Sequence, residues 1–151
     1  MSGMHPAAGR IAVTPRALSA QGHPELEPLT RAGYEVIYPS PGRLPTPPEQ
    51  LAFLPGCVGY LAGVEPIGAD LLRAAPGLRV ISRNGVGVEA IDLDAARAAG
   101  VAVEVAPGAN AQGVAELAIA LMFAALRHLA RRTPRSRRAG GSDAPGARWP
   151  D

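Results

Sequence analysis

Short runs of β-branched and apolar residues alternate with helical segments along most of this chain, and this alternation most constrains its fold. The clearest stretch runs from Val80 to Asn110, where an apolar run, a glycine-rich loop, a short helix, a second apolar run and a second loop follow one another. Strands that alternate with helices favour an α/β fold, with a parallel sheet covered on both faces. The predicted strands are residues 11–13, 35–38, 58–62, 79–82 and 101–105.

The predicted helices lie between the strands, and their ends carry recognisable signals. Pro24 is suited to the first position of a helix that Gly33 closes. Thr46, with Glu49 three residues later, has the spacing of a capping box. Asp92 is expected to cap a helix that Gly100 ends. The predicted helices are residues 24–32, a short helix from 47 to the Pro55-Gly56 pair, and residues 67–75, 93–99 and 114–130.

The last predicted helix, residues 114–130, is apolar around most of its circumference, which predicts burial on more than one side. Glu116 is expected in its first turn, where the helix dipole favours a negative charge. Its longest charge-free apolar run, Leu117 to Leu126, has ten residues and is too short to span a membrane. No signal-peptide pattern precedes the first strand, so we expect a cytoplasmic protein with no membrane partner.

The charge distribution divides the chain into a body and a tail. The 151 residues suffice for one domain, expected at residues 1–131. All 15 basic residues are arginine, and the absence of lysine excludes Schiff-base chemistry and a Walker-type phosphate loop. Residues 127–151 carry seven Arg and two Asp, but no aromatic residue beyond Trp149 is interleaved with them. We therefore expect residues 132–151 to be a disordered, solvated tail or linker, with no nucleic-acid partner.

The chain holds a single cysteine, Cys57, which excludes an internal disulfide and fits a reducing compartment. Because it leads into an apolar strand, a packed core thiol is favoured over a nucleophile. His5, His23 and His128 have no adjacent nucleophile or metal-like spacing and are expected to be surface or capping residues. The sequence therefore supplies no catalytic constellation and no metal site.

The loop Asn84-Gly85-Val86-Gly87 is the candidate ligand site. Its glycines allow a sharp turn that brings backbone N–H groups close to an anion such as a carboxylate, although a tight strand-to-helix turn explains them equally well. Arg83 either pairs with that anion or packs against Glu89 or Asp92. Asn110 ends the second loop, where satisfying loop backbone is favoured over contacting a ligand.

The stretch ISRNGVGVEAIDLDAARAAGVAVEVAPGANAQGVAELAIALM, with LAGVEPIGADLLRAAPGLRVISR and the opening IAVTPRALS, resembles the D-isomer-specific 2-hydroxyacid dehydrogenases, especially the phosphoglycerate dehydrogenase branch. The resemblance covers residues 10–130 and implies a flavodoxin-like substrate-binding domain with a five-stranded parallel sheet. It implies NAD as cofactor and a small 2-hydroxy or 2-oxo acid as substrate. The helix from Val114 would be the hinge helix that packs against a cofactor domain.

The resemblance also implies roles for both loops. Backbone amides around Gly85, Val86 and Gly87 would hold the substrate carboxylate, with Arg83 and Asn84 beside them. Residues Pro107, Gly108 and Asn110 would line the cleft near the cofactor.

Several positions depart from the family pattern. Glu89-Ala90 stands where many members have Asp-Asn, and Val105 where they have an Asn. Gly63-Val64-Glu65 stands where some phosphoglycerate dehydrogenases carry an arginine, so the identity of the acid stays open.

The dinucleotide fingerprint GxGxxG and the catalytic Arg, Glu and His of the family would follow the hinge helix, and they are absent before Asp151. We therefore expect a substrate-binding domain without a cofactor-binding domain, truncated, inactive alone and a poor binder of NAD. The alternative is a stand-alone carboxylate-binding or protein-interaction module, with a possible homodimer through the 114–130 helix. A flavodoxin-like receiver domain is disfavoured because its lysine is absent.

Overall fold

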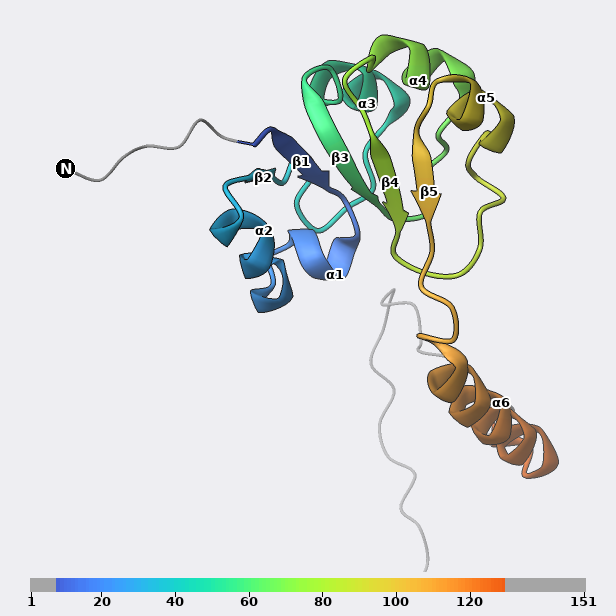
Figure 1. The fold of residues 1–151 in the computed structure, drawn as a ribbon. Coiled ribbons are helices and arrows are strands. Elements are labelled where there is room, and N and C mark those ends of the chain that lie inside the picture. Colours follow the sequence, from blue (N-terminus) through green and yellow to red (C-terminus); the bar gives the residue numbers. More distant parts are fainter. Residues whose placement is uncertain (1–7, 130–151) are drawn as a thin grey trace, which may run out of the picture. The chain divides into compact units, whose positions relative to one another are not determined.

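The computed structural model describes residues 8–129, which fall into two compact units on either side of the Asn110–Ala111 bond. The first unit is built on a five-stranded, all-parallel sheet with the order β2-β1-β3-β4-β5 (Figure 1). The strands are β1 (Arg10–Val13), β2 (Glu35–Ile37), β3 (Cys57–Ala62), β4 (Val80–Arg83) and β5 (Ala102–Glu104). The helices of this unit are α1 (Arg16–Ser19), the 3-10 helix η1 (Pro24–Leu26), α2 (Glu27–Arg31), α3 (Pro47–Phe53), α4 (Ala69–Ala74) and α5 (Leu93–Ala98). The second unit contains α6 (Ala111–Leu126).

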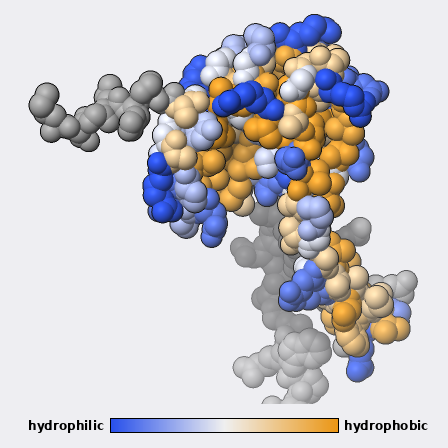
Figure 2. Space-filling model, in the orientation of Figure 1, coloured by the Kyte–Doolittle hydropathy of each residue, from blue (hydrophilic) through white to orange (hydrophobic). Residues whose placement is uncertain are grey.

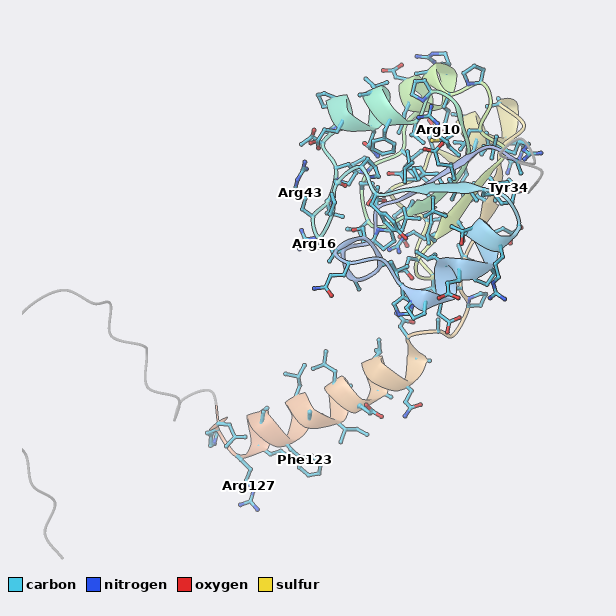
Figure 3. The ribbon with its side chains drawn as sticks, turned by 90° about the vertical axis from the view of Figure 1, so that its left-hand side faces the viewer. Arg10, Arg16, Tyr34, Arg43, Phe123 and Arg127 are labelled. Atoms are coloured by element: carbon cyan, nitrogen blue, oxygen red, sulfur yellow. The ribbon has the colours of Figure 1, made fainter. Side chains whose placement is uncertain are left out.

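The hydrophobic core lies on one face of the sheet. The register aligns Ala12, Tyr60, Ile81 and Val103 across β1, β3, β4 and β5, and the first three are almost fully buried. Leucines and alanines of α4 and α5 pack against this row. Figures 1 and 3 show α3 and α4 on one side of the sheet and α1 and α2 on the other. This is the expected flavodoxin-like α/β layering, with aliphatic side chains supplying most of the core.

The opposite face is less completely covered along β4 and β5. Ser82 and Ala102, which lie on this face, are exposed, and Val80 is only half-buried. Figure 2 shows hydrophobic surface over the region where Figure 1 draws β3, β4 and β5. The first unit therefore buries one sheet face more completely than the other.

The helix ends carry caps that the sequence predicts. Asp92 Oδ1 accepts the Ala95 amide at 2.9 Å and caps α5, and Gly100 closes that helix with φ +70°. His23 caps η1 by accepting the Glu25 amide at 3.3 Å. Thr46 and Glu49 form the predicted capping box of α3, in which the Thr46 amide donates to Glu49 Oε2 at 2.8 Å.

Three helix predictions need correction, and one helix was not predicted. The helix expected over 24–32 divides into η1 and α2, because Pro28 has no N–H to donate into a continuous helix. The helix expected over 67–75 begins at Ala69, because Ile67 pairs with Ile91 in a β-bridge. The four-residue α1 was not predicted, because Thr14-Pro15 indicates only the end of a strand.

The correction to the helix expected over 114–130 is larger. It begins three residues earlier, at Ala111, and ends at Leu126, because His128 has φ +52° and a left-handed residue cannot continue the helix. Glu116 therefore lies in the second turn, where it accepts a hydrogen bond from Gln112 Nε2 at 2.9 Å. Ala130 and the tail expected at 132–151 lie outside the described residues.

The Arg43–Glu49 pair makes the start of α3 sensitive to acid. Hydrogen bonding from Arg43, whose Nη1 lies 2.9 Å from Glu49 Oε2, and from the Thr46 amide lowers the pKa of the Glu49 carboxyl to about 2. A carboxyl whose folded pKa is lowered contributes stability above its ordinary pKa of 4.5, and that stability is lost as pH falls towards 2.

We therefore predict that Glu49→Gln destabilises the chain at neutral pH, and that its difference from wild type shrinks between about pH 5 and about pH 3. Urea unfolding at a series of pH values measures this difference. Glu27→Gln, at an exposed acid of α2, is the matched control. A difference that stays constant over this range would contradict the prediction.

Candidate functional site

The parallel strands place their carboxyl ends at one edge of the sheet, where ligands bind in open α/β folds. Thr14 follows β1, Ser40 lies beyond β2, Glu65 follows β3 and the Asn84–Gly87 loop follows β4. Register pairs join these ends directly, since Ala62 lies beside Arg83. This edge holds every residue that the sequence placed in a substrate site.

The Asn84–Gly87 loop is held by backbone hydrogen bonds on both sides. The Asn84 amide extends the β3–β4 ladder by donating to the Ala62 carbonyl at 2.9 Å. The Gly85 amide turns back to the Arg83 carbonyl at 2.7 Å, and Gly85 adopts φ +148°, which favours glycine. Two of the loop amides are therefore already engaged.

The next two amides differ, because Val86 and Gly87 donate no hydrogen bond within residues 8–129. Val86 is exposed, and Gly87 has no side chain to shield its backbone. Two successive backbone N–H groups without acceptors can bind an anion. Val86 and Gly87 are thus the available donors of the loop.

Two charged side chains flank these donors. Arg83 donates through Nη1 to the Asn84 carbonyl, and a Cβ added at Gly85 would lie 2.7 Å from that nitrogen. The guanidinium therefore lies over Gly85, and no ion pair joins it to Glu89 or Asp92 among the described residues. Glu89, by contrast, lies so close to Gly87 that an added Cβ would collide with its Oε2.

The second loop is joined to the first by one hydrogen bond. The Ala106 amide donates to the Gly85 carbonyl at 2.9 Å. Beyond it, Gly108 turns the chain with φ +73°, and Pro107, Gly108 and Asn110 are exposed. The Asn110 side chain makes no hydrogen bond within the described residues. The structure therefore brings the two loops together but assigns Asn110 no loop-closing role.

A buried polar cluster, formed by Thr14, Gln50, Tyr60 and Glu65, lies behind this edge and was not predicted. Glu65 Oε1 accepts hydrogen bonds from the Thr14 hydroxyl, the Tyr60 hydroxyl at 2.7 Å and the Gly63 amide at 3.0 Å. Gln50 Nε2 donates to the Tyr60 hydroxyl at 3.3 Å and to the Pro66 carbonyl at 3.1 Å. Burial raises the pKa of the Tyr60 phenol and keeps it in the donor form.

Sequence reasoning noted Glu65 only as a departure from a family pattern. The one local signal was an acidic residue between apolar neighbours directly after a strand. Glu65 Oε2 and Ser40 Oγ are buried without a hydrogen-bond partner in the described part of the chain. Two unsatisfied buried polar atoms, one beyond β2 and one beyond β3, lie at this edge of the sheet.

Other candidate chemistry is not supported. Cys57 is fully buried, its Sγ donates to the Phe53 carbonyl at 3.2 Å, and burial raises the pKa of the thiol, so the prediction of a core thiol is confirmed. Residues 8–129 contain no group of three His, Cys, Asp or Glu side chains able to hold a metal. No helix among them is long and apolar enough to cross a membrane. A hollow of about 320 Å³ lies between α3 and α4, but its walls do not include the Asn84–Gly87 loop.

Comparison with protein families identifies this architecture. Residues 16–143 match the profile of the D-isomer specific 2-hydroxyacid dehydrogenase catalytic domain. The chain belongs to this family. The match confirms the resemblance drawn from the sequence motifs.

Individual relatives are similar in sequence to only part of this chain. A hydroxypyruvate reductase of Thermotoga maritima is 46% identical over 65 residues, which are 43% of this chain and 21% of that protein. A D-3-phosphoglycerate dehydrogenase of Mycobacterium leprae is 47% identical over 64 residues, 42% of this chain and 12% of that protein. The matched segment therefore spans about a fifth or less of these dehydrogenases.

Solved structures extend the similarity to most of the fold. The TT0316 protein of Thermus thermophilus has a TM-score of 0.72 at 32% identity, over 81% of this chain and 38% of that one. The NAD⁺-bound 3-phosphoglycerate dehydrogenase of Entamoeba histolytica has a TM-score of 0.68 at 27% identity, over 78% and 39%. This chain spans less than half of either structure.

The described residues do not fit a dinucleotide. A pyrophosphate-binding turn opens directly into a helix, whereas α5 begins only at Leu93, well beyond Gly87. The carboxylate of Glu89 also lies against Gly87, where a pyrophosphate would bring more negative charge. No hydride-transfer step can therefore be derived from residues 8–129.

The polar cluster allows one prediction about stability. Tyr60→Phe removes the hydroxyl that donates to Glu65 and accepts from Gln50, so it should lower the free energy of unfolding by about 1–3 kcal/mol. Urea unfolding followed by circular dichroism measures the change. Tyr34→Phe, at a half-buried tyrosine outside the cluster, is the control. A loss at Tyr60 no larger than at Tyr34 would show that the cluster contributes no net stability.

Proposed function

We propose that this chain is the substrate-binding part of an NAD-dependent D-2-hydroxyacid dehydrogenase of the phosphoglycerate dehydrogenase type. In this proposal the Val86 and Gly87 amides hold the carboxylate of a small 2-hydroxy or 2-oxo acid. The observation that carries it is that these two successive N–H groups, at the carboxyl edge of the sheet, have no acceptor in the described structure.

Charge around the loop supports an anionic ligand. A carboxylate accepting two backbone N–H groups makes charge-assisted hydrogen bonds, which are stronger than neutral ones. The Arg83 guanidinium over Gly85 adds a fixed positive charge next to those donors. Asn84 and Gly85 shape the turn, since their own amides are engaged. Glu89 opposes binding, because its carboxylate lies beside Gly87.

Residues 8–129 do not form the cofactor site of the proposed dehydrogenase. When bound, NAD accepts a hydride from the 2-hydroxy acid or, as NADH, donates one to the 2-oxo acid. Pro107, Gly108 and Asn110, exposed beside the substrate loop, are proposed to line the cleft towards it. We propose that residues 1–151 alone bind NAD poorly and do not support turnover. A cytoplasmic location fits the single reduced, buried thiol of Cys57.

The names of the relatives point to two substrate classes, acids without a phosphate and acids with one. One is named for hydroxypyruvate, which has no phosphate, and several are named for 3-phosphoglycerate. Both classes carry the carboxylate that the Val86 and Gly87 amides would hold. The proposal so far concerns only that shared group.

Titration of the ¹⁵N-labelled chain with D-glycerate tests carboxylate binding. We expect saturable amide shifts concentrated at Val86 and Gly87. Glu89→Gln should lower the dissociation constant for D-glycerate about two- to fivefold, because it removes an exposed negative charge next to the ligand. Glu27→Gln, on α2, should leave it unchanged. Shifts that are absent, or spread equally over the surface arginines, would refute the proposal.

A second candidate function is an interaction module that associates through α6. The supporting observation is the exposure of large apolar side chains along this helix, including Phe123 at 62% and Leu126 at 75%. Figure 3 shows Phe123 and Arg127 projecting from it. An apolar helix left open to water favours association with a like helix. The proposed assembly is a homodimer through the helix predicted at 114–130 and observed from Ala111.

Sedimentation at increasing protein concentration tests this second candidate. We expect a monomer–dimer equilibrium whose dissociation constant rises at least about tenfold in Phe123→Glu, because the variant would bury a charge in the interface. Gln112→Glu, at an already polar position of α6, is the control. A wild-type chain that stays monomeric throughout would remove this candidate without affecting carboxylate binding.

A further inference from the structure

Glu65 is the one carboxylate that the first unit buries at the proposed substrate edge. Its side chain is 2% exposed, and Oε1 accepts all three of its hydrogen bonds. Oε2 is buried with no partner among the described residues. In the described structure this side chain acts only as a hydrogen-bond acceptor.

The position of this carboxylate relative to the substrate loop follows from a short series of contacts. Glu65 Oε1 accepts the Gly63 amide at 3.0 Å, and Gly63 directly follows Ala62. The Ala62 carbonyl in turn accepts the Asn84 amide at 2.9 Å. Because neighbouring strands lie about 4.8 Å apart, Glu65 is within roughly 10 Å of the loop that carries Val86 and Gly87.

No cation neutralises Glu65 in the described structure. The ion pairs formed by residues 8–129 are Arg43–Glu49, Arg73–Asp70 and Arg97–Asp94, and none of them includes Glu65. Its partners are two hydroxyls and an amide, which solvate the charge without cancelling it. A buried charge is screened less than an exposed one, so its field reaches the neighbouring loop.

We propose that Glu65 makes this site selective for acids with a single negative charge, and that it disfavours those with a second anionic group such as a phosphate. The inference rests on the proposed function, because it assumes that the first carboxylate binds at Val86 and Gly87. The Arg83 guanidinium offsets one negative charge at the loop. A second anionic group a few ångströms along the ligand falls within the field of Glu65.

A tail that extends from the Val86 and Gly87 amides towards the β3 end approaches Glu65, because the two loops follow adjacent strands. Glu65 acts through its charge and not by touching the ligand, because Oε2 is buried beside Gly63. It is therefore a specificity-determining residue and not a catalytic one. The expected substrates are short 2-hydroxy or 2-oxo acids with an uncharged tail.

Paired titrations of the ¹⁵N-labelled 151-residue chain test the inference. D-Glycerate and D-3-phosphoglycerate are compared at the same ionic strength and at a pH where the phosphate is mainly dianionic, with dissociation constants taken from the Val86 and Gly87 amides. We expect D-glycerate to bind about tenfold more tightly. Glu65→Gln should change glycerate affinity less than about twofold and remove most of the preference, whereas Glu27→Gln should keep it.

The outcomes separate the inference from the proposed function. Equal or tighter binding of D-3-phosphoglycerate by the wild type, or an unchanged preference in Glu65→Gln, overturns the role of Glu65 while carboxylate binding stands. If neither ligand shifts the Val86 and Gly87 amides, the inference and the proposed function are both overturned.

Should Glu65→Gln not fold, the wild type gives a second readout. A preference caused by repulsion from Glu65 shrinks as salt increases. A preference that is independent of salt, or that grows with it, overturns the inference.

Discussion

The parallel hydrogen-bond ladder through β1, β3 and β4 is the interaction on which the rest of the first unit depends. It aligns Ala12, Tyr60 and Ile81 into one buried row, and so determines which face of the sheet forms the core. The same register brings the carboxyl ends of the three strands to one edge. Loops that are distant in sequence, beginning after Val13, Ala62 and Arg83, become neighbours there.

The electrostatics of that edge follow from how the ladder ends. Its last rung, from the Asn84 amide to the Ala62 carbonyl, places the glycine loop directly beside the β3 loop. On one side the loop presents two free N–H groups and the Arg83 guanidinium. On the other, Glu65 is buried among hydroxyl donors with no cation. In the proposed function, Arg83 favours binding of the carboxylate that the candidate acids share. Glu65 opposes a second negative charge farther along the ligand.

α6 poses a different physical problem from the sheet unit. The sheet unit buries a core of aliphatic side chains within itself, whereas α6 has no buried residue and leaves Leu117, Phe123 and Leu126 exposed. Membership of the D-isomer specific 2-hydroxyacid dehydrogenases places this chain among proteins more than twice as long as the part it matches. Exposed apolar area of this extent favours a covering partner, and a second copy is the partner that sedimentation can detect directly.

Sequence by itself determined the elements whose causes are local. Period and β-branched content located the five strands, and single side chains such as Asp92 and Gly100 located helix ends, because a cap is made within a few residues. The glycines after the fourth strand likewise located the Asn84–Gly87 loop. Predictions failed where a distant or conformational effect intervened, as with the bridge from Ile67 to Ile91 and the left-handed backbone of His128. Only the tertiary structure decided which loop amides stay free and that Glu65 is buried with one unpartnered oxygen, because both depend on hydrogen bonds between strands far apart in sequence.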